Sequence, residues 1–149
     1  MTDFVKMREL IRQEERYRWA VEQQMARATK MTSEMSKAGK ARTNKVGSQV
    51  EEGAVELASL KSEYQEIKDE LDAMKAELRI SISKLRAPRY RLDKTCLRMR
   101  YLQGISVRKI AVSLNYHEQY LFRKMREAED MITAMQKKAE SKNKIAQVR

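Results

Sequence analysis

The hydrophobic pattern of the first third of the chain predicts one long helix. Residues 3–36 contain neither Gly nor Pro, and their apolar positions are spaced mostly by three or four residues. These positions are Phe4, Met7, Ile11, Val21, Met25, Ala28 and Met35. Such spacing is typical of an amphipathic helix, and Asp3 stands where an N-cap is favoured. Leu10, Tyr17 and Trp19 lie on an adjoining face, where we expect Trp19 to pack within a hairpin or a dimer.

Residues 46–86 carry a sustained seven-residue repeat. Ten of its twelve seam positions are apolar: Val46, Val50, Gly53, Leu57, Leu60, Tyr64, Ile67, Leu71, Met74, Leu78, Ser81 and Leu85. This repeat predicts a coiled-coil helix whose seam needs a partner. The partner is either the first helix, folded back as an antiparallel hairpin, or a second copy of the chain. The intervening residues 36–45 carry four cations and no large apolar side chain, so they predict a mobile connection, and their shortness favours the hairpin.

After Pro88, the only proline, the pattern changes to three short helices with brief turns. The first is expected at about 89–102, with Leu92, Cys96, Met99 and Leu102 on one face, and ends at Gly104. The second, with Ser106 as its cap, has inward residues Val107, Ile110, Ala111 and Leu114. The third runs from Glu118 to about Gln136 and buries Leu121, Met125, Ala128 and Ile132. Between the last two helices, Asn115 suits a positive φ and His117 stands at a cap position, and the tail from Lys137 is expected to be frayed.

Charge distinguishes the two halves of the chain. The net charge is +11. Residues 1–83 hold equal numbers of cationic and acidic side chains, whereas residues 84–149 hold seventeen Lys or Arg against six Asp or Glu. A localised positive field is typical of proteins that bind nucleic-acid phosphates, although anionic lipid or an acidic protein would also be attracted. No apolar run is long enough to span a membrane, so we expect no membrane partner and a cytoplasmic location.

A short helix, a tight turn and a second helix predict a helix-turn-helix motif, in which the second helix enters the major groove of double-stranded DNA. The candidates for reading base edges are Glu118, Gln119, Tyr120, Phe122, Arg123 and Arg126. The candidates for holding phosphates are Lys94, Arg98, Ser106, Arg108, Lys109, His117 and Lys124. Phe122 is open to a second interpretation, as a core residue under the preceding helices. The predicted fold class is therefore all-α: a long antiparallel coiled-coil hairpin over 1–86, a helix-turn-helix domain over 87–136, and a basic tail over 137–149.

The sequence gives little support to catalysis, to metal binding or to a disulfide. A single cysteine, Cys96, and a single histidine, His117, cannot form a disulfide or a usual four-ligand metal site within one chain. No glycine loop for phosphates and no nucleophile–base motif is present. We therefore expect no enzymatic activity, no catalytic residues, no cofactor and no bound metal, and we interpret Cys96 as a structural thiol.

The stretch Leu97–Ile132 resembles region 4 of the sigma-70 family. The resemblance is carried by Arg100, Tyr101, Leu102, Gly104, Ser106, Ile110, Ala111 and Leu114. The layout of nearly the whole chain resembles phage-encoded regulators of late transcription, with a restart at Lys45 and Val46 and an entry at Pro88, Arg89 and Tyr90. Asn115 and His117 depart from the family pattern, where Gly and Ser or Thr are common.

The resemblance implies a sequence-specific transcriptional activator of phage late genes that works with the host RNA polymerase in a bacterial cytoplasm. Because the chain has no room for the sigma domain that melts promoters, the resemblance implies a regulator and not a complete sigma factor. The sequence does not decide whether the coiled coil also forms a homodimer. One alternative is a DNA-packaging protein like the small terminase subunit, which also joins such a motif to long helices. Another is a structural coiled-coil adaptor with a basic tail.

Overall fold

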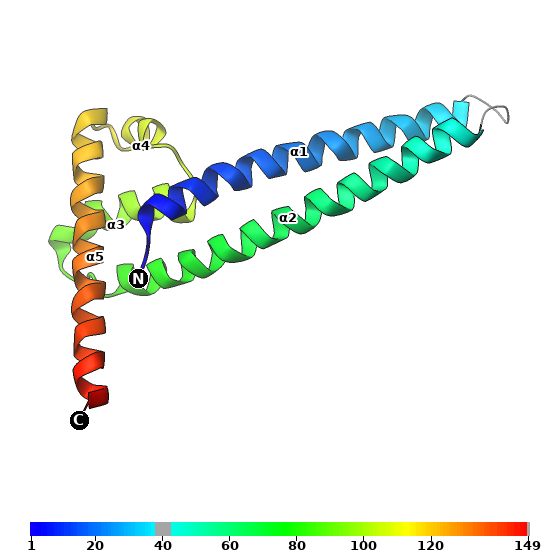
Figure 1. Cartoon of the computed structure of the whole chain (residues 1–149). Coiled ribbons are helices and arrows are strands. Elements are labelled where there is room, and N and C mark those ends of the chain that lie inside the picture. Colours follow the sequence, from blue (N-terminus) through cyan, green and yellow to red (C-terminus); the bar gives the residue numbers. More distant parts are fainter. Residues whose placement is uncertain (38–42, 149) are drawn as a thin grey trace. The chain divides into compact units, whose positions relative to one another are not determined.

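The computed structural model describes the backbone of residues 1–37 and 43–148, and every regular element in these ranges is helical. The chain is therefore all-α, as predicted (Figure 1). Side chains are described for residues 1–30, 33 and 50–148. The centre of the expected connection at 36–45 lies outside the described residues, and its two ends belong to helices.

The two long helices match the positions predicted for them. Helix α1 spans Phe4–Lys37, and the Asp3 carboxylate caps it by accepting a hydrogen bond from the Lys6 N–H at 3.0 Å. Helix α2 spans Thr43–Ser83. It ends before Ala87, whose extended backbone (φ −66°, ψ 141°) is the conformation favoured before a proline. Pro88 then opens the next element, as expected.

The C-terminal part is more finely divided than predicted. The helix expected at 89–102 consists of a 3-10 turn η1 (Pro88–Tyr90), helix α3 (Arg91–Leu97) and a π-helical turn η2 (Arg98–Leu102). Gly104 follows with a positive φ of 69°, a conformation that favours glycine. Helix α4 (Val107–Leu114) and helix α5 (Glu118–Val148) complete the chain.

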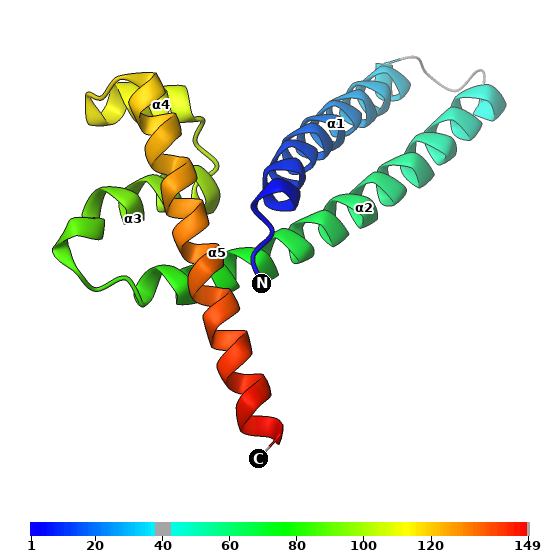
Figure 2. The ribbon, with the colours of Figure 1, turned by 60° about the vertical axis from the view of Figure 1, so that its left-hand side comes forward.

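Helix α5 corrects the expectation of a frayed tail after Lys137, because it continues without a break to Val148. No Gly or Pro interrupts residues 118–148, and the added stretch is rich in Lys, Ala, Glu and Gln, which are good helix formers. Every side chain from 137 to 148 is exposed. Figure 2 shows this end of α5 running on past α3 and α4.

The chain forms two compact units that do not divide at the expected boundary near residue 87. The terminal unit consists of Met1–Ile11 together with the chain from Leu71 onward, and the middle unit is Arg12–Glu70. The start of α1 and the end of α2 thus belong with the C-terminal helices.

The core of the terminal unit joins apolar side chains from both ends of the chain. Its fully or almost fully buried members include Met7, Leu78, Ile82, Cys96, Leu97, Tyr101, Ile110, Leu121 and Ile132. Phe4 packs against Tyr101 with ring centroids 5.1 Å apart. Burial raises the pKa of the Cys96 thiol, in keeping with a packed structural role.

A part-buried polar cluster crosses this core. The Arg8 guanidinium donates to the Tyr101 hydroxyl at 2.9 Å and to both oxygens of Glu129 at 3.0 and 3.1 Å. The Tyr101 hydroxyl in turn donates to Glu129. Burial, followed by this bond to Glu129, raises the pKa of Tyr101. The cluster ties α1 to η2 and α5 with satisfied polar groups.

Within the middle unit, α1 and α2 run in opposite directions and contact through polar pairs. The Tyr64 hydroxyl donates to Glu14 at 2.9 Å, and the Gln24 amide donates to Glu56 at 3.2 Å. From Gly53 to Ile67 the predicted α2 seam is the less exposed face of this unit, but its side chains are only half-buried, and Val50 is exposed. Trp19 is 64% exposed, so the expectation that it packs within a hairpin is wrong, while packing within a dimer stays a prediction.

Candidate nucleic-acid interface

The turn between α4 and α5 is short and closed by local hydrogen bonds. Ser106 caps α4, its hydroxyl accepting the Lys109 N–H at 3.4 Å. At the other end Asn115 adopts the left-handed conformation (φ 57°, ψ 44°) expected for it, and its N–H bonds to carbonyls of α4. His117 caps α5 through Nδ1, which accepts the Gln119 N–H at 3.3 Å. The chain therefore reverses over residues 115–117 alone.

The predicted inward faces of these helices are confirmed except at Leu114. Val107, Ile110 and Ala111 of α4 are buried, as are Leu121, Met125, Ala128 and Ile132 of α5. Leu92, Met99, Leu102 and Leu114 are only half-buried. Because the apolar stripe of each helix is fixed against the core, the opposite faces are held toward solvent in a definite orientation.

The exposed face of α5 gathers most of the predicted base-reading residues. Gln119, Phe122, Arg123 and Arg126 are all exposed and recur at three- and four-residue spacing, so they share one side of the helix. Glu118, in the first turn, is also exposed. Phe122 is 47% exposed, which excludes the interpretation of this side chain as part of the core.

Tyr120 is half-buried and belongs to an aromatic stack beside that face. Its ring lies 5.5 Å from the ring of Tyr116 at an interplanar angle of 20°, and the Arg123 guanidinium lies 5.5 Å above the Tyr120 ring. A cation held over an aromatic face loses some of its conformational freedom. The stack therefore restrains Arg123 before any ligand arrives.

The predicted phosphate-holding residues fall into two groups. Arg98, Ser106, Arg108, Lys109 and His117 are exposed, with Arg108 and Lys109 on the outer side of α4. Lys94 is half-buried. Lys124 is set apart from the base-reading face, because it is 31% exposed and forms an ion pair with Glu127 at 3.6 Å.

Lys124 also lines a hollow of about 280 Å³, which no pattern in the sequence predicts. Asp93, Glu127, Arg89 and Tyr90 contribute to the same wall. Asp93 is 8% exposed, and its burial raises the pKa of the carboxyl group, with the nearby Lys124 acting in the opposite direction. The Arg89 guanidinium lies 4.8 Å over the Tyr90 ring. The positive charge of Lys124 is thus already balanced by the carboxylates of Glu127 and Asp93.

Two exposed apolar residues of the interface were not among the predicted site residues. Val112 stands on the outer face of α4, one turn beyond Arg108 and Lys109, and is 79% exposed. Tyr116 is exposed in the turn. The spacing of Val112 from Arg108 places both on one face and was a usable signal. Contact with the methyl group of thymine is one use of such a side chain.

The described residues contain no cluster of three or more potential metal ligands. None of the helices, over the part of the chain that is described, is long and apolar enough to cross a bilayer. Neither a protein-family model, nor a curated protein, nor a solved structure matches this chain. The features that indicate a function are therefore the geometry of α4, of the turn and of α5.

Proposed function

We propose that the chain is a sequence-specific transcriptional regulator that binds double-stranded DNA through α4 and α5 as a helix-turn-helix. The observation that carries the proposal is the exposed face of α5, where Gln119, Arg123 and Arg126 lie together beyond a three-residue turn. In such motifs the N-terminal part of the second helix meets base edges in the major groove.

The side chains of this face suit purine recognition. Arginine makes paired hydrogen bonds to the O6 and N7 of guanine, and glutamine makes the corresponding pair to adenine. The Tyr120 ring orients Arg123, so less entropy is lost when that pair of bonds forms. The exposed cations Arg98, Arg108 and Lys109 would hold phosphates, which would position the motif without reading sequence.

The middle unit would bind protein and not DNA. We interpret its two opposed helices as an antiparallel coiled-coil hairpin that engages a protein partner, the host RNA polymerase or a second copy of the chain. The pairs Glu14–Tyr64 and Gln24–Glu56 support the hairpin, since the partner in α2 comes earlier in the chain as the position in α1 comes later. The resemblance to phage late-transcription regulators favours activation over repression.

Binding-site selection from a random duplex library tests the DNA-binding part directly. Sites enriched by the full chain are measured by fluorescence anisotropy at about 150 mM salt, where nonspecific binding is weak. We expect Arg123→Ala to weaken specific binding by about 5- to 150-fold, the equivalent of one lost paired base contact. The matched control is Arg16→Ala, which removes an exposed arginine from the middle unit. Failure to enrich any sequence, or equal losses in the two variants, would contradict the proposal.

The regulatory part has its own test. Transcription in vitro by a purified bacterial RNA polymerase, from a promoter that carries the selected site, should rise when the chain is added. It should stay at the basal rate with Arg123→Ala. A fall in transcript with the wild-type chain would instead assign repression, and an unchanged level would remove transcription regulation from the proposal while leaving DNA binding in place.

A further inference from the structure

A second surface, distinct from the DNA-binding face, lies on the outer side of α1 within the middle unit. We call it the Trp19 stripe. It consists of Arg12, Arg16, Trp19, Gln23, Arg27 and Lys30, all exposed. These positions are three or four residues apart, so they form one face of the helix about 27 Å long at 1.5 Å per residue.

The stripe faces away from α2. The residues of α1 that bond to α2 in this unit include Glu14, Tyr17 and Gln24, whose partners are Tyr64, Glu63 and Glu56. Trp19 and Arg16 fall on the opposite side of the helical repeat from these residues. Pairing of α1 with α2 therefore leaves the stripe uncovered.

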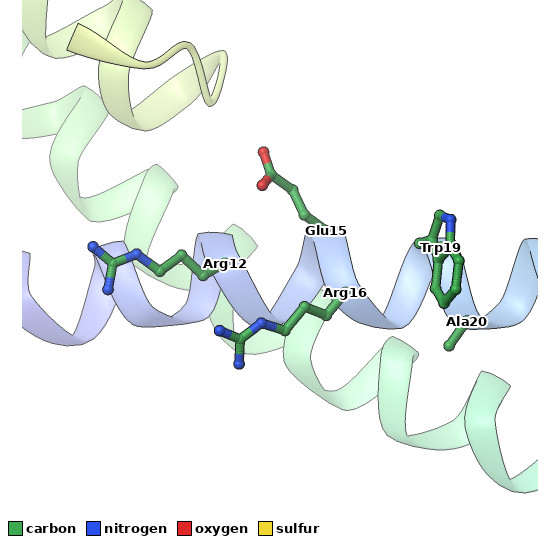
Figure 3. A pocket seen from close by; sticks show the side chains of 5 residues that line it. All are labelled: Arg12, Glu15, Arg16, Trp19 and Ala20. Atoms are coloured by element: carbon green, nitrogen blue, oxygen red, sulfur yellow. The ribbon is translucent and has the colours of Figure 1, made fainter.

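Trp19 borders a shallow hollow of about 550 Å³. The other residues that line it are Arg12, Glu15, Arg16 and Ala20. Figure 3 shows the side chains of Arg12 and Arg16 extending the same way along the helix, with the indole of Trp19 standing one turn further on. An indole that is 64% exposed leaves a large apolar area in water.

The charges around Trp19 indicate the kind of partner that would cover its exposed indole. The stripe holds four cations, and Glu15 is the acidic residue in the lining of the hollow. Among the side chains that the structure describes, no carboxylate forms an ion pair with Arg16 or Arg27. Trp and Arg are the residues that most often dominate the energy of protein interfaces.

We propose that the Trp19 stripe binds an acidic segment of another protein, with an apolar side chain of that segment against the indole and carboxylates against the arginines. A second copy presenting the same stripe is disfavoured, because four cations would face four cations. Duplex DNA would satisfy the charges, but phosphate contacts make no use of an exposed indole at the centre of the stripe. This surface goes beyond the proposed DNA binding and does not depend on it.

Trp19 is the only tryptophan of the chain, so its fluorescence reports on this surface alone. The probe is a synthetic 18-residue peptide with Asp and Glu on one face around a central Leu–Phe pair. Titration of the full chain with this peptide should shift the emission maximum to shorter wavelength and protect Trp19 from acrylamide quenching. A peptide of the same composition with Lys in place of the acidic residues should do neither.

Variants separate this surface from the DNA-binding face. Arg16→Glu with Arg27→Glu should weaken peptide binding about tenfold or more, because two attractions become repulsions, and both positions are exposed enough to leave the helix intact. Arg123→Ala should leave peptide binding unchanged while it weakens DNA binding. A Trp19→Phe chain, followed by anisotropy of labelled peptide, checks that affinity falls when the indole is lost.

Three results would overturn the proposal. The first is an unchanged Trp19 signal at millimolar acidic peptide. The second is protection of Trp19 by duplex DNA that the paired reversal Arg16→Glu, Arg27→Glu abolishes, which would assign the stripe to nucleic acid. The third is protection that appears with increasing protein concentration alone, together with a doubled mass in sedimentation, which would assign the stripe to self-association.

Discussion

Replacing Tyr101 by Phe tests the polar cluster that crosses the core of the terminal unit. The change removes one hydroxyl, which donates to Glu129 and accepts from Arg8, and it keeps the ring in contact with Phe4. Hydrogen bonds to charged groups contribute about 1.5–3 kcal/mol each. The direct Arg8–Glu129 pair at 3.0 Å survives the change and keeps both charges satisfied. We therefore expect a loss near the lower limit, about 1.5 kcal/mol.

Urea denaturation followed by circular dichroism measures this loss as a change in the free energy of unfolding. A loss of about 1.5 kcal/mol corresponds to a fall in Tm of roughly 3–6 °C for a chain of this size. The matched control is Tyr17→Phe, whose hydroxyl bonds to Glu63 at the surface of the middle unit, and it should leave the free energy of unfolding almost unchanged. If the two variants lost the same amount, the inference that the part-buried cluster stabilises this unit would be wrong.

Three further changes test other parts of the terminal unit. Asn115→Val places a β-branched residue at φ 57° and should lower Tm by several degrees, whereas Asn115→Gly should not. Equal Tm values for the two variants would contradict the left-handed backbone conformation at residue 115. Burial raises the folded-state pKa of Asp93 above 3.8. The protonated carboxyl group therefore makes its full contribution to folding stability below pH 3.8, and this contribution is lost as the pH rises through the raised pKa. Asp93→Asn should therefore stabilise the chain at pH 7 and confer no advantage near pH 3, as urea titrations at the two pH values would show. The buried Cys96 thiol should react with a thiol reagent only at the rate of unfolding, and rapid labelling of the native chain would refute its burial.

The local features of the terminal unit could be predicted because short-range patterns determine them. The apolar spacing of α4 and α5 fixed which side chains are buried, and the residue types at 104, 106 and 115 indicated where helices end and begin. The exposure of Gln119, Arg123 and Arg126 followed from the same spacing. The expectation of a frayed tail after Lys137 is wrong, because the intrinsic helix propensity of this terminal stretch continues α5 to Val148.

The long-range contacts could not be predicted, because no periodicity encodes them. The Thr2 N–H donates to Gln136 at 2.7 Å, and the Gln136 amide donates to Ser81 at 2.9 Å. Arg8 likewise reaches Glu129 across most of the sequence. Polar residues at such positions have the same appearance in a sequence whether they face solvent or a distant helix. The membership of residues 1–11 in the terminal unit was missed for this reason.

The terminal unit is discontinuous in sequence, since the chain leaves it after Ile11 and re-enters it at Leu71. The middle unit is thus an insertion between two segments of one domain. The entropy of closing such an insertion grows only with the logarithm of its length, by about 0.6 kcal/mol for each doubling. Homologous chains can therefore lengthen or shorten both helical arms in step at little cost to the domain that carries α4 and α5. The reach of the insertion is free to evolve separately from the DNA-binding face that we propose.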